Sequence, residues 1–87
     1  MDINIEQLKK KIIYRSQYRG TREMDNLMSS FVKMYIDEFN IRNLKDLEKL
    51  LNIDDNNLYN FYNGTNTNYQ FEDNNVNTLF KNFRLKK

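Results

Sequence analysis

The chain has 87 residues, of which 39% are hydrophobic and 30% charged, a composition typical of one compact globular domain. Its formal net charge of +2 is too small to indicate nucleic-acid binding. Cysteine and histidine are both absent, which excludes disulfide frameworks, thiolate or imidazole metal sites and catalytic triads with a histidine base from these residues alone.

The sequence shows no targeting or membrane segment. Residues 1–6 have no basic flank before a long apolar run, and they lack the Arg-rich composition of a mitochondrial presequence. No stretch approaches the roughly 20 apolar residues that cross a bilayer. We therefore expect a cytoplasmic protein without membrane insertion, or a mitochondrial matrix protein if the source is eukaryotic.

Helical periodicity dominates the sequence. Proline is absent, glycine occurs only twice, and apolar residues recur at spacings of three and four. These features predict an all-α fold, a small single-domain bundle of about five short helices over residues 1–87. The helices are expected at residues 4–18, 21–39, 43–51, 54–63 and 73–84.

The first two helices are expected to meet in a tight turn at Gly20, which either closes the first helix or caps the second. Ile5, Leu8 and Ile12 form the buried stripe of the first helix. The second helix has the longest stripe and should be the central one. Its members are Met24, Leu27, Met28, Phe31, Tyr35 and Phe39.

Asparagine and aspartate mark the starts of the later helices. Asn43 is expected to cap the third helix. Asp54 should cap the fourth, where Ile53 and Leu58 have the spacing of a hydrophobic staple. The fifth helix is expected to begin at Asp73. Its buried residues should be Val76, Leu79, Phe80 and Phe83.

A polar, turn-like connection is expected over residues 65–72, after Gly64 ends the fourth helix. Tyr69 and Phe71 are expected to return to the core from this connection. Basic residues at the end of the fifth helix suit the negative pole of its dipole. They are Lys81, Arg84, Lys86 and Lys87.

The junction between the first two helices concentrates charge around a glycine. From Arg19 to Asp25 the chain reads Arg-Gly-Thr-Arg-Glu-Met-Asp. If Gly20 is a helix cap, the Glu23 carboxylate can accept the backbone N–H of Gly20, as in a capping box. Glu23 therefore has a structural interpretation as well as a functional one. Arg19 has few expected partners within a tight turn, so we expect it to project towards a partner protein. Arg22 and Asp25 are expected to form a solvated face of the second helix.

This segment resembles the succinate dehydrogenase assembly factor family, the flavinator of bacteria and assembly factor two of mitochondria. The family's mark is an Arg-Gly pair followed two residues later by Glu, an apolar residue and Asp, as at Arg19 to Asp25. A second block, residues 50–62, resembles the family's paired-Leu, paired-Asp segment before an aromatic helix. Asn56 replaces a frequent proline, and Phe61 replaces a tryptophan. The resemblance fades after this helix.

The resemblance implies a five-helix bundle that docks on the succinate dehydrogenase flavoprotein subunit, or on the related fumarate reductase subunit, and promotes covalent attachment of FAD. The chain would be an assembly factor rather than an enzyme, with no catalytic, metal or cofactor-binding residue of its own and with FAD on the partner. Since the chain has no histidine, the histidine that receives the flavin must belong to the partner. Since it has no glycine-rich fingerprint, no dinucleotide-binding site is visible in the chain. We expect a monomer when the protein is free.

We expect a docking surface, centred on Arg19, Gly20 and Glu23, to hold the flavoprotein in a conformation competent for self-flavinylation. Replacement of Arg19 or Glu23 by alanine should then reduce flavinylation and leave the fold intact. Proton transfer by Glu23 is an alternative role. The expected partner-binding residues are Arg15, Tyr18, Arg19, Gly20, Glu23 and Asp25.

Two other functions fit the same charge pattern. Lysines at positions 9 to 11 and nearby arginines could bind nucleic acid, with an affinity that falls steeply with salt. A protein-interaction domain unrelated to flavin would share the fold. Asp54 and Asp55 could form a metal pair, but helix capping explains them better. The aromatic residues Tyr59, Phe61 and Tyr62 could stack on bases or flavin, although such spacing usually indicates core packing.

Overall fold

The computed structural model describes residues 4–84, and within that range the chain forms five helices and no strands. The predicted all-α bundle is therefore confirmed. The helices are α1 (Ile5–Gln17), α2 (Arg22–Tyr35), α3 (Ile41–Leu51), α4 (Asp55–Tyr62) and α5 (Asn75–Asn82).

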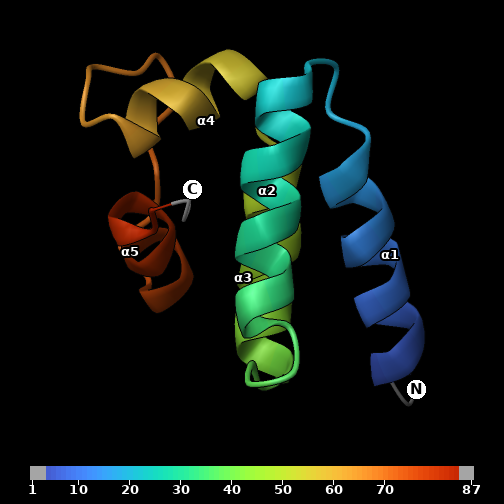
Figure 1. The fold of residues 1–87 in the computed structure, drawn as a ribbon. Helices are drawn as coiled ribbons and strands as arrows, with labels where there is room; N and C mark the ends of the chain where they lie inside the picture. The colour runs from blue at the N-terminus through green and yellow to red at the C-terminus, as the bar shows by residue number, and fades with distance from the viewer. Residues whose placement is uncertain (1–3, 85–87) are drawn as a thin grey trace.

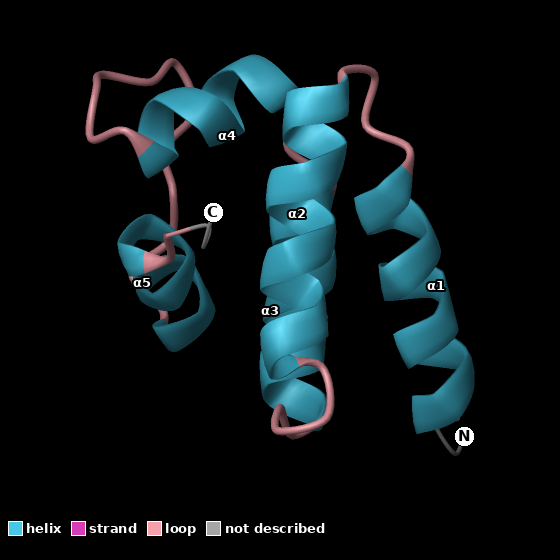
Figure 2. Ribbon diagram, in the orientation of Figure 1, coloured by secondary structure: helices cyan, strands magenta, loops and turns pink. Residues whose placement is uncertain are grey.

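The first three helices form the body of the bundle. α1 packs against both α2 and α3, while α5 packs against α3 and α4 (Figure 1). α4 lies across one end, close to the start of α2. The loop between α1 and α2 and the turn between α3 and α4 therefore lie at the same end of the bundle (Figure 2). No helix in residues 4–84 is long and apolar enough to cross a membrane.

One cluster of apolar side chains fills the centre. Phe31 of α2 is fully buried, and its ring meets Phe80 and Phe83 edge-on, with centroids 5.3 and 5.4 Å apart. Phe31 thus joins α2 to the C-terminal part of the chain. Ile12, Leu44, Leu47, Leu58 and Val76 are also fully buried in this core.

Each helix begins after a polar cap whose side chain accepts the backbone N–H three residues further on. Asp54 caps α4 as predicted. The prediction for α3 is wrong, because Asn40 is the cap and Asn43 supplies the N–H that bonds to it at 2.8 Å. Asn74, rather than Asp73, caps α5. The five caps are Asn4, Thr21, Asn40, Asp54 and Asn74.

The end of α2 also differs from its predicted position. α2 ends at Tyr35, and residues 36–38 form a turn rather than a further helical turn. Ile36 is nevertheless 6% exposed, and the Phe39 ring stacks on Tyr35 at 5.4 Å. Because these turn residues still face the core, apolar spacing could not show where the helix stops.

Gly64 ends α4 as predicted. Its φ of +75° lies in the left-handed region. The N–H of Gly64 donates to Phe61 O at 3.1 Å and that of Thr65 donates to Asn60 O at 2.9 Å, the two bonds of a Schellman motif. These bonds satisfy carbonyl groups that the last turn of the helix leaves free.

The connection after Gly64 returns to the bundle through one aromatic residue. Phe71 stacks on Phe61 with centroids 3.9 Å apart. Tyr69 is 44% exposed, so the prediction that it packs into the core is wrong. Leu79 of α5 is partly buried, and the predicted basic residues Lys86 and Lys87 lie outside the described residues.

The position of the α3 cap gives a direct test. Asn40→Ala should lower the free energy of unfolding by about 1 kcal/mol, because it removes the acceptor for the Asn43 N–H. Asn43→Ala should have a much smaller effect, since its side chain does not cap the helix. Urea denaturation of the two variants measures both values, and a larger loss for Asn43→Ala would contradict the observed cap.

Candidate functional site

Arg19 follows α1 and turns its side chain into the protein, where 10% of the side chain remains exposed. Its Nε donates to Asp55 Oδ1 at 2.9 Å, and its Nη2 donates to Ile53 O at 2.7 Å. Its Nη1 donates to Leu51 O. We call these three contacts the Arg19 bridge. They join the α1–α2 junction to the α3–α4 junction.

The expectation that Arg19 has few partners and projects outwards is therefore wrong. Its partners lie 32 to 36 positions further along the chain, so local sequence could not identify them. The guanidinium suits this place, because carbonyl groups at the end of a helix lack intrahelical donors and carry partial negative charge. Asp55 adds a full negative charge at the start of α4.

Asp25 and Gly20 shape the turn that carries Arg19. Asp25 Oδ1 accepts the backbone N–H of Arg19, so this half-buried carboxylate holds the turn as well as facing solvent. Gly20 has a φ of +115°, which L-residues rarely adopt. A Cβ at Gly20 would lie 3.6 Å from Asp55 Oδ2, an ordinary contact. The backbone conformation, rather than lack of space, therefore requires glycine here.

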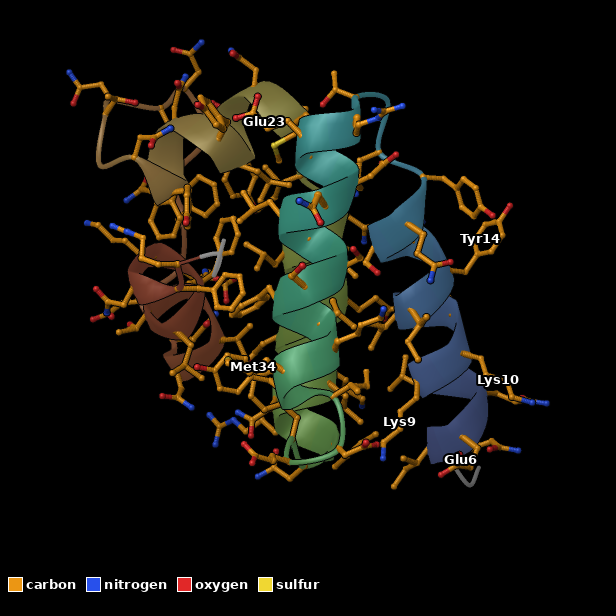
Figure 3. The ribbon with its side chains drawn as sticks, in the orientation of Figure 1. Glu6, Lys9, Lys10, Tyr14, Glu23 and Met34 are labelled. Carbon is orange, nitrogen blue, oxygen red and sulfur yellow. The ribbon has the colours of Figure 1, made fainter. Side chains whose placement is uncertain are left out.

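Glu23 is displayed at the surface. Thr21 caps α2 by accepting the Met24 N–H at 3.2 Å, so Gly20 is not the cap and the capping-box interpretation of Glu23 is wrong. Figure 3 shows Glu23 at the end of the bundle, close to α4. Within residues 4–84, no side chain forms a hydrogen bond or ion pair with its carboxylate. This carboxylate is available to a partner.

Two exposed tyrosines lie at the C-terminal end of α1. Tyr14 and Tyr18 are 65% and 71% exposed, and their ring centroids lie 4.9 Å apart. Figure 3 shows Tyr14 pointing away from the bundle. Tyr14 is not among the predicted partner-binding residues, although its spacing of four from Tyr18 predicts contact between the two side chains on a helix. Arg15, between them in sequence, is half-buried and donates to Asn52 Oδ1.

These tyrosines border an open groove of about 510 Å³. Its inner wall is the Arg19 bridge and the turn from α3 to α4. Of the six predicted partner-binding residues, the structure exposes Tyr18, Gly20 and Glu23. It leaves Arg15, Arg19 and Asp25 partly buried with partners inside the protein.

Asp54 at the rim of this groove has a structural role. The Asn57 side-chain amide donates to Asp54 at 2.7 Å, and this bond, with that from the Asn57 N–H, lowers the pKa of Asp54 below its ordinary 3.8. Because folding lowers this pKa, the stabilisation is present above pH 3.8 and is lost as the pH falls through the lowered value. The capping interpretation is confirmed for Asp54, whereas Asp55, in the first turn of α4, pairs with Arg19.

Removal of the Arg19 side chain should therefore destabilise the fold. We expect Arg19→Ala to lower the free energy of unfolding by about 2–4 kcal/mol, because it leaves Asp55 and two carbonyl groups without their donor. Arg22→Ala, at an exposed position on α2, should change it by less than about 0.5 kcal/mol. Denaturant unfolding measures both variants, and equal stability of the two would contradict the bridge.

Comparison with known proteins agrees with the motif. Residues 10–84 match the family described as flavinator of succinate dehydrogenase. A protein of Schizosaccharomyces japonicus named succinate dehydrogenase assembly factor 2, mitochondrial, is 38% identical over 45 residues, which are 52% of this chain and 32% of the relative. One of Drosophila willistoni named succinate dehydrogenase assembly factor 2-B, mitochondrial, is 36% identical over 66 residues, or 76% of this chain and 42% of the relative.

The chain thus spans less than half the length of these curated relatives. No solved structure matches it. The family match extends over most of the chain and includes the Arg19 bridge, the Glu23 surface and all of α2 to α5. The chain belongs to the flavinator of succinate dehydrogenase family.

Proposed function

We propose that this protein is an assembly factor that binds the flavoprotein subunit of succinate dehydrogenase and promotes covalent attachment of FAD to that subunit. Family membership supports the link with succinate dehydrogenase. The observation that carries the proposal is the exposed Glu23 beside Gly20, at the end of the bundle that the Arg19 bridge holds together. A fixed surface with a carboxylate that has no partner in the described part of the chain is suited to docking.

The proposed docking surface consists of Tyr18, Gly20 and Glu23. Tyrosine contributes strongly to protein interfaces because its large, rigid ring loses little conformational entropy on binding. Gly20 has no side chain and allows a partner to approach the backbone closely. Glu23 can accept charge-assisted hydrogen bonds. Arg19 and Asp25 support this surface from within rather than contacting the partner.

The chemistry of flavin attachment would belong to the partner. The chain has no histidine to receive the flavin. Its role is to bind the conformation of the flavoprotein in which the partner's own groups and FAD react, which increases the population of that conformation. FAD and the succinate dehydrogenase flavoprotein, or the related fumarate reductase subunit, are the cofactor and partners in this proposal.

Nucleic-acid binding fits the structure less well. Lys9 pairs with Asp37 at 3.6 Å, and Lys11 pairs with Glu48 at 2.9 Å. Arg19 donates to groups inside the protein. Three of the cations between residues 9 and 22 are thus paired with groups of the same chain. This pairing reduces the positive electrostatic field that phosphate binding requires.

In-gel flavin fluorescence of the denatured flavoprotein subunit tests the proposal. Cells that lack this protein should lose most of the covalent flavin, and the wild-type chain should restore it. Tyr18→Ala and Glu23→Ala should restore less, because each removes an exposed group of the docking surface without breaking the Arg19 bridge. Tyr69→Ala, an exposed tyrosine outside this surface, is the control and should restore fully.

Thermal unfolding of each purified variant separates docking from folding. Equal covalent flavin with and without the chain would contradict the proposed function. Full restoration by both Tyr18→Ala and Glu23→Ala would contradict the proposed surface. Arg19→Ala is unsuitable as a docking variant, because it should destabilise the fold. A loss of covalent flavin with this variant could then come from unfolding rather than from lost contact with the partner.

A further inference from the structure

A second groove lies between the start of α2 and α4. Its volume is about 330 Å³, and Asp55 lines both this groove and the one beside Tyr18. Met24, 4% exposed, and the Tyr59 ring, 41% exposed, provide its apolar surface. The complete lining is Thr21, Glu23, Met24, Asp55, Asn56 and Tyr59.

Tyr59 is not needed to fill the core. The next residue but one, Phe61, stacks on Phe71, and Leu58 on the inner face of α4 is fully buried. Within the described residues, the Tyr59 ring stacks on no other aromatic ring, and no cation lies over it. A large aromatic side chain that is exposed beside a groove provides contact area for an incoming group.

The charge in this groove is negative. Two carboxylates line it, and no cationic side chain does. Oδ1 of Asp55 is neutralised by Arg19 at 2.9 Å, whereas the Glu23 carboxylate has no partner among residues 4–84. One uncompensated negative charge therefore lies beside an aromatic face.

We propose that this groove binds an arginine side chain of the flavoprotein subunit. A guanidinium can stack on the Tyr59 ring and donate two hydrogen bonds to the Glu23 carboxylate, and its methylene groups can pack on Met24. The inference rests on the proposed function and extends it. It adds Tyr59 and Met24 to the docking surface and specifies the partner group that meets Glu23.

Binding of the full chain to the purified flavoprotein subunit, measured by calorimetry at several salt concentrations, tests this inference. Glu23→Gln keeps the size of the side chain and removes its charge, and Tyr59→Leu removes the ring. Each should weaken binding about tenfold or more, as for a central interface residue. Glu23→Gln should also reduce the dependence of affinity on salt.

Two matched controls accompany these variants. Glu38→Gln removes an exposed carboxylate elsewhere, and Tyr69→Leu removes a tyrosine of similar exposure, 44% against 41% for Tyr59. Both should bind like the wild type. Circular dichroism and thermal unfolding establish that all four variants are folded.

The outcomes separate the two proposals. If the wild type binds and Glu23→Gln binds equally well with the same salt dependence, the arginine inference is wrong while the proposed function stands. If only Tyr59→Leu weakens binding, the groove holds an apolar group and the inference is also wrong. If the wild type does not bind the flavoprotein subunit, both proposals fail.

Discussion

The guanidinium of Arg19 holds together the end of the bundle where the candidate site lies. It bonds to the last residue of α3, to the turn that follows and to the first residue of α4. In a domain of this size, where the core alone stabilises weakly, such a contact between two junctions has a large effect. Without it, the carbonyl groups at the end of α3 and the Asp55 carboxylate would depend on water.

The Arg19 bridge also determines which side chains are exposed at this end of the bundle. Since Arg19 points inwards and Asp25 binds its backbone, the turn at Gly20 is fixed, and α2 begins at Arg22 after its cap Thr21. Glu23 then lies in the first turn of α2, and its carboxylate has no bonded partner among residues 4–84. The Arg-Gly-x-x-Glu motif therefore contains residues with two separate tasks. Its arginine organises the junction, and its glutamate lies at the surface, where the proposed docking would use it.

Much of the fold could be predicted because its determinants are local. Apolar spacing located five helices. Asp54 is a residue type that favours the cap position and precedes the apolar pattern of α4, and Gly64 supplies the positive φ that ends this helix. The end of α2 could not be predicted, since Ile36 continues the apolar stripe into the turn. At the site, residue types identified the junction, but the orientation of Arg19 depends on groups more than thirty positions away.

A double-mutant cycle on Arg19 and Asp55 tests the bridge most directly. The free energy of unfolding would be measured for Arg19→Met, for Asp55→Asn and for the double variant. Because the two side chains are bonded at 2.9 Å and partly buried, we expect a coupling energy of about 1–3 kcal/mol. Effects that add to within about 0.5 kcal/mol would show that the pair does not hold the junctions together.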